Sequence, residues 1–329
     1  MLIFPSSIKD MKLYLGHKTA FAYWCSHDLL SRKPIKASKH AFKTPTKELI
    51  AAAFKEVDGL KIPLDIIVRD ANSRRPSMPQ ISWHSIGSSL PQYSFINHSA
   101  HVAFSSPEAC FLQLATCLTP IELIMAGCEL CGTYAVDPNT NQLINRKKRT
   151  AIDSLKTYLN RAGTIKGSLK AKTALKYLFD NSASPMETKL ALLLSLPTSM
   201  GGYGIPKPKL NEQIVTSSDN SSIPSGGSPY NELFRCDLCW PHKKLAIEYD
   251  SHLYHANNHK IDLDSTRRIR IETERIRVLS VTKQQIYNEF EFEKLAIVIA
   301  RYLNYRLRIT RKDFAKRRHT LRRQLGFIR

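Results

Sequence analysis

The chain has 329 residues, 43% of them apolar, and it carries 49 Lys and Arg against 28 Asp and Glu, a net charge of +21. This length exceeds one average domain, and the apolar fraction excludes an intrinsically disordered chain. The surplus of positive charge favours a polyanionic partner, nucleic acid before an anionic membrane, although a merely basic soluble protein would share this composition.

The apolar stretches are short, and the cysteine count is odd. The longest mostly apolar stretches, such as residues 190–196, fall far below the ~18 residues that cross a bilayer. The first residues lack the basic start and apolar stretch of a secretory signal. We therefore expect a cytoplasmic protein without membrane contact, whose seven cysteines are reduced thiols.

The first hundred residues mix helical and extended patterns. Residues 19–25 and 46–54 carry apolar residues at helical spacing, whereas residues 62–68 and 101–104 have the composition of strands. Two predicted helices follow, each with a hydroxyl at its N-cap and a proline at its first position. One begins after Ser106 and the other after Thr119, where Glu122 adds a capping box.

A resemblance accompanies these elements. Residues 102–115, preceded by Ile-Ser-Trp-His-Ser at residues 81–85, resemble abortive-infection antitoxins of the AbiEi type, and residues 19–24 match the early helix of that family loosely. The resemblance covers roughly residues 15–135. It implies a winged-helix region coupled to an α/β domain, and DNA binding or target recognition rather than catalysis.

Two segments are strongly basic and almost free of acids. Asp153 is the only acid in residues 146–176, and Asp313 is the only acid after residue 305. Such a run is often a solvated helix face, but here the ion-pair partners of such a face are missing, which favours phosphate contact. The candidate nucleic-acid contacts are Arg146, Lys147, Lys148, Arg149, Lys170, Lys172, Lys316, Arg317, Arg318, Arg322 and Arg323.

The back half begins with a predicted helix at residues 184–196, whose opening Ser-Pro-Met-Glu makes Glu187 the third residue of a capping box. The elements predicted after it are a Gly/Pro loop (197–208), a strand (211–215), a Ser/Gly/Asn loop (216–229), strands (233–239 and 245–250), a helix (264–275), a strand (277–281) and a closing helix (289–307).

Three acids lie on the predicted hairpin of this half. If it turns about residues 242–243, Asp237 lies directly opposite Glu248, and Asp250 shares their face because strand side chains alternate. Carboxylates on one face repel each other, and a divalent cation such as magnesium offsets this repulsion and activates water for phosphodiester hydrolysis. The spacing alone equally allows a hairpin with solvated acids on its outer face.

A wider pattern favours the metal site. Its residues resemble the small restriction-endonuclease-fold domains related to very-short-patch mismatch repair nucleases, within the PD-(D/E)xK superfamily, and they are Asp237, Glu248-Tyr-Asp250, His255, Asp264-Ser-Thr-Arg267, Ile271 and Val278-Leu-Ser-Val-Thr282. The resemblance covers about residues 184–303. It implies a four-stranded mixed sheet between helices that cuts DNA with Mg²⁺ or Mn²⁺.

The resemblance also implies roles for single residues. Asp237 and Glu248 would be metal ligands, and Asp250 a third ligand or an acid that supports them. His255 would be a base or phosphate contact, and Arg267 would hold the acids or a phosphate.

Glu187 would orient a metal-bound water, although its place in the capping box explains it equally well. The chain departs from the family pattern in three places, and the last two of these suit an inactive copy. Asp250 stands where many relatives of the fold have lysine, and Ser251 and Arg275 stand where glycines are common.

Other metal sites are possible from spacing. Two Cys-x-x-Cys pairs, Cys128/Cys131 and Cys236/Cys239, have a spacing that is found in zinc sites. The two cysteines of the second pair would point to opposite faces of a strand. Buried thiols therefore explain both pairs better than zinc ligands do. The spacing of three histidines would also allow a metal site, but the nearby acids already account for the functional pattern of this segment. These histidines are His252, His255 and His259.

The sequence therefore predicts an α/β (α+β) chain with four parts: a mixed α/β antitoxin-like domain (1–145), a basic helical connector (146–183), a restriction-endonuclease-like domain (184–307) and a basic tail (308–329). The function predicted from the resemblance is magnesium-dependent cleavage of duplex DNA, in phage defence or repair. A DNA-binding regulator with a vestigial nuclease domain, or a basic RNA-binding factor, stays open.

Overall fold

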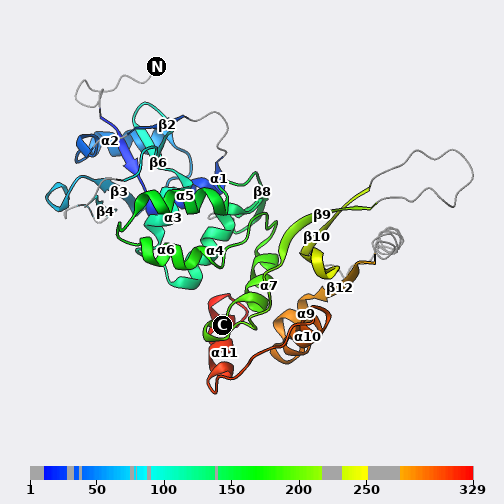
Figure 1. The fold of residues 1–329 in the computed structure, drawn as a ribbon. Coiled ribbons are helices and arrows are strands. Elements are labelled where there is room, and N and C mark those ends of the chain that lie inside the picture. The colour runs from blue at the N-terminus through cyan, green and yellow to red at the C-terminus, as the bar shows by residue number, and fades with distance from the viewer. Residues whose placement is uncertain are drawn as a thin grey trace, which may run out of the picture. The chain divides into compact units, whose positions relative to one another are not determined.

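The computed structural model describes residues 11–27, 33–36, 39–74, 78, 80–86, 90–137, 140–216, 232–250 and 275–328, with the backbone alone at 214–216, 232–234 and 250. The chain divides into two compact units, Met1–Leu178 and Phe179–Arg329 (Figure 1). Among the described residues, no helix has the length and apolar character needed to cross a membrane.

The first unit contains a six-stranded mixed sheet in the order β2-β5-β6-β1-β3-β4. Two neighbouring pairs, β1 with β6 and β3 with β4, are parallel, and the others are antiparallel. The strands are β1 (Leu13–Leu15), β2 (Pro34–Ile35), β3 (Leu64–Val68), β4 (Ile81–Ser85), β5 (Phe95–Asn97) and β6 (Val102–Ser105). Strands β1, β3 and β6 are buried throughout, so the core of this unit lies around them.

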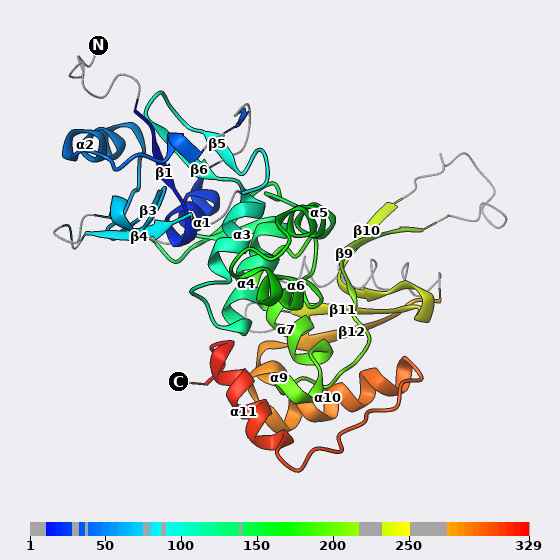
Figure 2. The same ribbon diagram turned by 60° about the vertical axis from the view of Figure 1, so that its left-hand side comes forward.

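Helices and a small hairpin complete the first unit, and Figures 1 and 2 show α3, α4, α5 and α6 gathered together beside the sheet. The elements are α1 (His17–Ser26), η2 (Lys39–Ala41), α2 (Lys47–Glu56), η3 (Ala71–Ser73), α3 (Pro107–Leu114), α4 (Pro120–Cys131), β7 (Tyr134–Val136), β8 (Leu143–Asn145), α5 (Ile152–Ala162) and α6 (Ser168–Leu175). Helices α5 and α6, which lie in the predicted connector, pack against α3 and α4.

The local sequence explains where α3 and α4 begin. The Ser106 hydroxyl accepts the N–H of Ala109 at 3.3 Å, and proline occupies the next position. Thr119 and Glu122 form a reciprocal capping box, with bonds of 3.4 and 2.7 Å. Both predicted helix starts are confirmed, because each cap satisfies backbone donors that the first turn leaves free.

The second unit contains a four-stranded mixed sheet, as predicted, in the order β12-β11-β10-β9. Strands β9, β10 and β11 are antiparallel neighbours, and β12 is parallel to β11. The strands are β9 (Lys209–Thr216), β10 (Glu232–Trp240), β11 (Leu245–Asp250) and β12 (Arg277–Thr282), and the short helix η5 (Pro241–Lys243) joins β10 to β11.

Helices flank this sheet, and Figure 2 shows α9, α10 and α11 grouped together beside it. The helices are α7 (Pro185–Ser195), η4 (Thr198–Met200), α9 (Lys283–Tyr287), α10 (Glu289–Tyr302) and α11 (Phe314–Gln324). Helix α11, within the predicted tail, packs against η4. Gly201 makes this approach possible, because a Cβ there would lie 2.4 Å from the Arg317 carbonyl oxygen.

The core of the second unit combines the sheet with α7 and α10. Leu238 of β10 and Ile247 of β11 are completely buried. Phe292 of α10 and Leu192 of α7 are buried as well. The sheet thus presents an apolar face to packed helices, and its acids occupy other positions of the same strands.

Candidate active site

The hairpin acids lie at the end of a regular strand ladder. Strands β10 and β11 pair regularly from Trp240 opposite Leu245 to Leu238 opposite Ile247, and Asp237 and Glu248 are the residues that follow this last pair. The Oδ2 atom of Asp237 accepts the backbone N–H of Tyr249 at 2.7 Å. The Asp237 carboxylate is therefore held against the backbone beside Glu248, and both acids are partly buried.

Polar residues of the two outer strands accompany these acids. Glu248 pairs with Ser280 of β12. On the other side, β10 pairs with β9 at Cys236 opposite Glu212 and at Leu238 opposite Leu210, so Asp237 and Asn211 each lie between two paired positions. Asn211, Asp237, Glu248 and Ser280 thus come from four neighbouring strands, with the two carboxylates on the two central strands.

Glu187 reaches Asn211 from the start of α7. Its side chain is buried, and its Oε2 atom accepts the backbone N–H of Ala183 at 2.8 Å and the Nδ2 of Asn211 at 2.5 Å. The Ser184 hydroxyl accepts the Glu187 N–H at 3.2 Å, as predicted. The Glu187 carboxylate accepts the N–H of Ala183 rather than the N–H of the N-cap residue Ser184, because its hydrogen bond with Asn211 holds the carboxylate towards β9.

Asn211 is the residue of this site that the sequence analysis missed. Besides its bond to Glu187, it donates to the Asn181 carbonyl at 2.9 Å and accepts the Arg235 Nε at 2.7 Å. Its backbone has a φ of +51° inside strand β9. Asparagine tolerates this left-handed conformation better than most residues, so an asparagine inside a predicted strand was the sequence signal for an irregular position there.

The other predicted site groups lie outside the described residues. These are His255, Arg267, the side chain of Asp250, and the histidines His252 and His259. Among the side chains that are described, no group of three or more His, Cys, Asp or Glu is arranged to hold a metal ion.

The Cys-x-x-Cys pairs are packed groups. Cys128, Cys131, Cys236 and Cys239 are all buried, and the last two share one cluster with Ala246. Strict alternation predicted opposite faces for Cys236 and Cys239. The regular pairing with β11 ends at Leu238, where the Asp237 side chain replaces a backbone acceptor, so the alternation does not extend to Cys236.

The predicted nucleic-acid contacts of the first unit fall into two groups. Arg149 is buried and donates to the Trp24 carbonyl at 2.9 Å, and Arg146 donates to the Glu129 carbonyl at 2.7 Å. Burial lowers the pKa of Arg146. Lys170 and Lys172 donate to the Leu118 and Gly163 carbonyls, and the exposed members of the set are Lys147 and Lys148.

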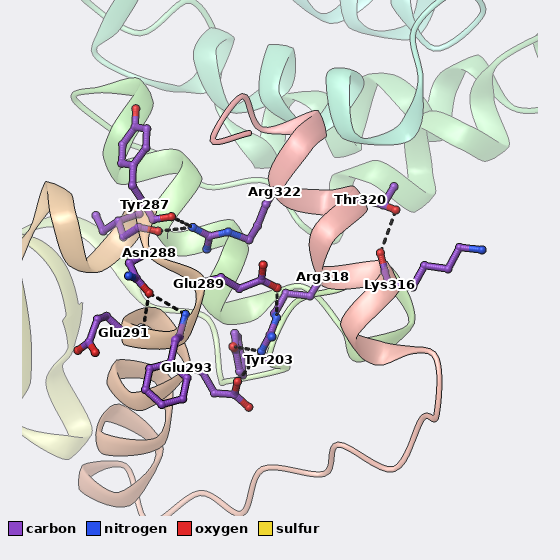
Figure 3. Close-up of polar contacts among 12 residues, drawn as sticks. Tyr203, Tyr287, Asn288, Glu289, Glu291, Glu293, Lys316, Arg318, Thr320 and Arg322 are labelled. Carbon is purple, nitrogen blue, oxygen red and sulfur yellow. Dashed lines mark hydrogen bonds and ion pairs between the residues drawn. The ribbon is translucent and has the colours of Figure 1, made fainter. Parts of the chain in front are cut away.

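Most predicted contacts of the tail hold α11 in place (Figure 3). Arg322 is completely buried and donates to the Ile286 and Tyr287 carbonyls at 2.6 and 2.7 Å. These carbonyls end helix α9, so Arg322 satisfies acceptors that a helix C-terminus leaves free.

Arg318 and Arg317 make further structural contacts. Arg318 donates to Glu289 at 2.6 Å, to Glu293 at 2.7 Å and to the Tyr203 hydroxyl at 3.0 Å. Arg317 pairs with Asp313 at 2.6 Å. The remaining two predicted contacts of this helix, Lys316 and Arg323, are exposed.

A second polar cluster, which the sequence analysis did not predict, lies in the first unit. The Nε2 of His84 and the Oδ1 of Asp65 are 2.7 Å apart, and the ring of His17 stacks on His84 at 3.5 Å between centroids. The Oδ2 of Asp65 accepts the N–H of Thr19 at 3.0 Å, so Asp65 also caps α1. These residues come from distant parts of the chain, which is why no local motif signals them.

Two cavities border this cluster. One of about 500 Å³ is lined by Asp65 and His84, and another of about 340 Å³ is lined by His17 and His84. His17 has a φ of +46°, and its buried Nδ1 has no hydrogen-bond partner among the described residues. The bonds of Asp65 to Thr19 tie the cluster to α1 and give it a structural role.

No family model, curated protein or solved structure matches this chain. The chemistry of the candidate site therefore follows from its own residues. Carboxylate oxygens on adjacent strands are suitable ligands for a hard divalent cation, and an acid held from a neighbouring helix can orient a water molecule.

Proposed function

We propose that the second unit is a metal-dependent DNA nuclease with a restriction-endonuclease-like fold, in which Asp237 and Glu248 hold Mg²⁺ or Mn²⁺. The observation that supports the proposal is the hydrogen bond from the Tyr249 N–H to Oδ2 of Asp237, which holds this carboxylate against the residue next to Glu248 on the neighbouring central strand. A bound divalent cation would offset charge on the scissile phosphate and make a water more acidic.

The neighbouring residues suit defined supporting tasks. Asp237 accepts the Tyr249 N–H through Oδ2, which fixes the plane of its carboxylate. Among the described residues, both hydrogen bonds to the Glu187 carboxylate use Oε2, so Oε1 is the atom that would orient the attacking water. We propose Asp250 as a third ligand or supporting acid, and His255 and Arg267 as phosphate contacts, from the family pattern.

The charge of the chain supports DNA as the substrate. A net charge of +21 favours a polyanion, because each phosphate contact by Lys or Arg releases condensed counterions. The first unit, with its antitoxin-like sequence pattern, would help to hold the duplex. Phage defence or DNA repair is the biological setting that we propose for such an enzyme.

The test is cleavage of supercoiled plasmid by the full-length protein with Mg²⁺ or Mn²⁺. Asp237→Asn and Glu248→Gln should each lower the rate of cleavage by about 100-fold or more, and the double variant should be little worse, since both residues serve one ion. Asp153→Asn, which changes an exposed acid of the first unit, is the matched control and should cut like wild type.

Two outcomes would contradict the proposal. Equal cleavage by the double variant would remove Asp237 and Glu248 from the site. Failure of the wild type to cut plasmid, mismatched and modified DNA would favour a DNA-binding regulator with a vestigial nuclease domain. Stronger binding to structured RNA than to duplex DNA would favour an RNA-binding factor.

A further inference from the structure

The segment that joins α10 to α11 carries cations and aromatic rings side by side. Residues 301–312 contain five cations and no acid, and all five cations are exposed. The Tyr302 and Tyr305 side chains are 39% and 36% exposed. Figure 2 shows the segment as an outlying loop between the two helices. We call six of its exposed residues the basic–aromatic strip: Arg301, Tyr302, Tyr305, Arg306, Arg308 and Lys312.

The cations of the strip are not neutralised by nearby acids. Within the described part of the second unit, none of the strip's four cations forms an ion pair. The fifth cation of the segment, Arg311, pairs with Asp313 at 2.9 Å and is left out of the strip for that reason. The strip therefore combines high positive charge with free guanidinium groups, a combination that suits a polyanionic partner.

The acids of α10 are already engaged elsewhere. Glu289 and Glu293 pair with Arg318, and Glu291 pairs with Lys294. The acids of α10 are thus paired with Arg318 and Lys294 rather than with the cations of the strip.

Both ends of the strip are anchored in the fold. Leu303 is buried at one end, and Phe314 is buried at the other. Asn304, with a φ of +52°, ends α10, and the N–H of Tyr305 bonds to the Ala300 carbonyl at 2.8 Å. A surface held in this way loses less conformational entropy when it binds a ligand than a free tail would.

The strip also contacts the strand next to the hairpin acids. The guanidinium of Arg277, the first residue of β12, lies 4.5 Å from the centroid of the Tyr302 ring. The same strand carries Ser280, which pairs with Glu248. A ligand held on the strip would therefore lie on the unit that carries the candidate site.

We propose that the basic–aromatic strip binds the sugar–phosphate backbone of DNA, and that Tyr302 and Tyr305 give it an added affinity for unpaired bases. Guanidinium groups bond phosphates in pairs of hydrogen bonds, and tyrosine rings stack on any base. The choice of DNA rests on the proposed function, but binding by the strip does not require a working nuclease site.

The test measures DNA binding by the full-length protein with fluorescence anisotropy in EDTA, so that no metal-dependent cleavage occurs. Arg306→Gln/Arg308→Gln should lower duplex affinity at least about tenfold at 50 mM salt. It should also reduce the slope of log K against log salt by about 1.8, since each phosphate contact contributes about 0.9. The control Lys47→Gln/Lys55→Gln removes two exposed cations of α2 and should change neither value.

The aromatic part of the proposal has its own variant. Tyr305→Ala should weaken binding of a single-stranded oligonucleotide about fivefold or more, and should weaken binding of the duplex less, because stacking requires unpaired bases. Phe54→Ala, which removes an exposed ring of α2, is the control and should bind both DNAs like wild type.

The outcomes separate this proposal from the proposed function. A folded Arg306→Gln/Arg308→Gln variant with wild-type affinity and salt slope would overturn it, as would a wild type that binds no DNA or prefers RNA of the same sequence. A protein that binds through the strip but never cuts would refute the nuclease and leave the strip standing. Equal thermal melting of variant and wild type shows that a loss of affinity is not a loss of folding.

Discussion

His17 combines three properties that rarely occur together in one residue. It is buried, it has a positive φ, and its ring stacks on His84, which itself bonds to Asp65. Burial, with the neighbouring His84, lowers the pKa of His17 to about 3. Burial alone would raise the pKa of Asp65, but the hydrogen bond and charge of His84 lower it overall. The fold therefore stabilises His17 neutral and Asp65 ionised.

This arrangement predicts a loss of stability in mild acid. Below pH 6.5 the unfolded chain binds a proton at His17 that the folded protein does not bind until about pH 3. Stability should therefore fall as the pH drops through this window, by on the order of 1 kcal/mol at pH 5.5 from His17. Asp65, whose lowered pKa adds stability at higher pH, acts in the same direction.

The variant that tests this is His17→Asn, because asparagine accepts the positive φ without the titrating ring. Urea unfolding between pH 7 and pH 5 should show a flatter pH dependence for this variant than for wild type. The control His319→Asn changes an exposed histidine and should keep the wild-type slope. An unchanged slope in His17→Asn would show that His17 does not set the acid sensitivity.

At the scale of elements, Asn211 links α7, β9 and β10. It bonds to Glu187 at the start of α7 and to Arg235 on β10, while its own backbone bends β9. Three elements are thus oriented by one side chain, and the candidate acid Glu187 is positioned through it. Loss of this residue should affect both the stability of the second unit and the placement of the acid.

We predict that Asn211→Ala destabilises the second unit by roughly 2 kcal/mol, because it leaves a buried carboxylate short of a donor and forces alanine into a positive φ. Asn211→Gly relieves the backbone strain but not the lost bonds, so its effect should be smaller. Gln213→Ala changes an exposed neighbour on β9 and should stay within about 0.5 kcal/mol of wild type. Equal stability of all three variants in urea unfolding would contradict the role given to Asn211.

Elements with local signals could be predicted from the sequence, and those that depend on distant pairing could not. The caps at Ser106, Thr119 and Ser184 follow from residues within one turn, and the hairpin register follows from a short turn. The contacts of Asn211 depend on how β9 meets α7 and β10, which no local pattern encodes. The order of the six-stranded sheet joins strands of two to five residues from distant positions, too short to show a period.

The net charge of the chain can be predicted from its sequence, but which cations are exposed and which are used in packing cannot. The sequence marks Arg318 and Arg322 as cations of a basic tail, and the structure uses them to hold α11 against α9 and α10. Arg306 and Arg308, in the same basic run, are exposed. Only the packing of the folded protein distinguishes arginines that hold helices together from arginines that are exposed, because both have the same sequence pattern.

At the scale of the whole molecule, the chain is two compact units with separate cores. Ile66 of β3 is completely buried in the first unit, and Leu192 of α7 is completely buried in the second. A unit with its own core can unfold as one cooperative step, so we expect calorimetry of the full-length protein to show two transitions.

Two matched core substitutions identify these transitions. Ile66→Ala and Leu192→Ala should each cost about 2–5 kcal/mol, the range for removing a buried aliphatic side chain. Each should lower the midpoint of one transition and leave the other within about a degree, because a cavity in one core does not loosen the other. Lys47→Ala, at an exposed position of α2, should move neither midpoint. A single transition that both core variants shift equally would mean that the two units unfold as one. The basic–aromatic strip and the acids Asp237 and Glu248 would then depend on the integrity of the first unit.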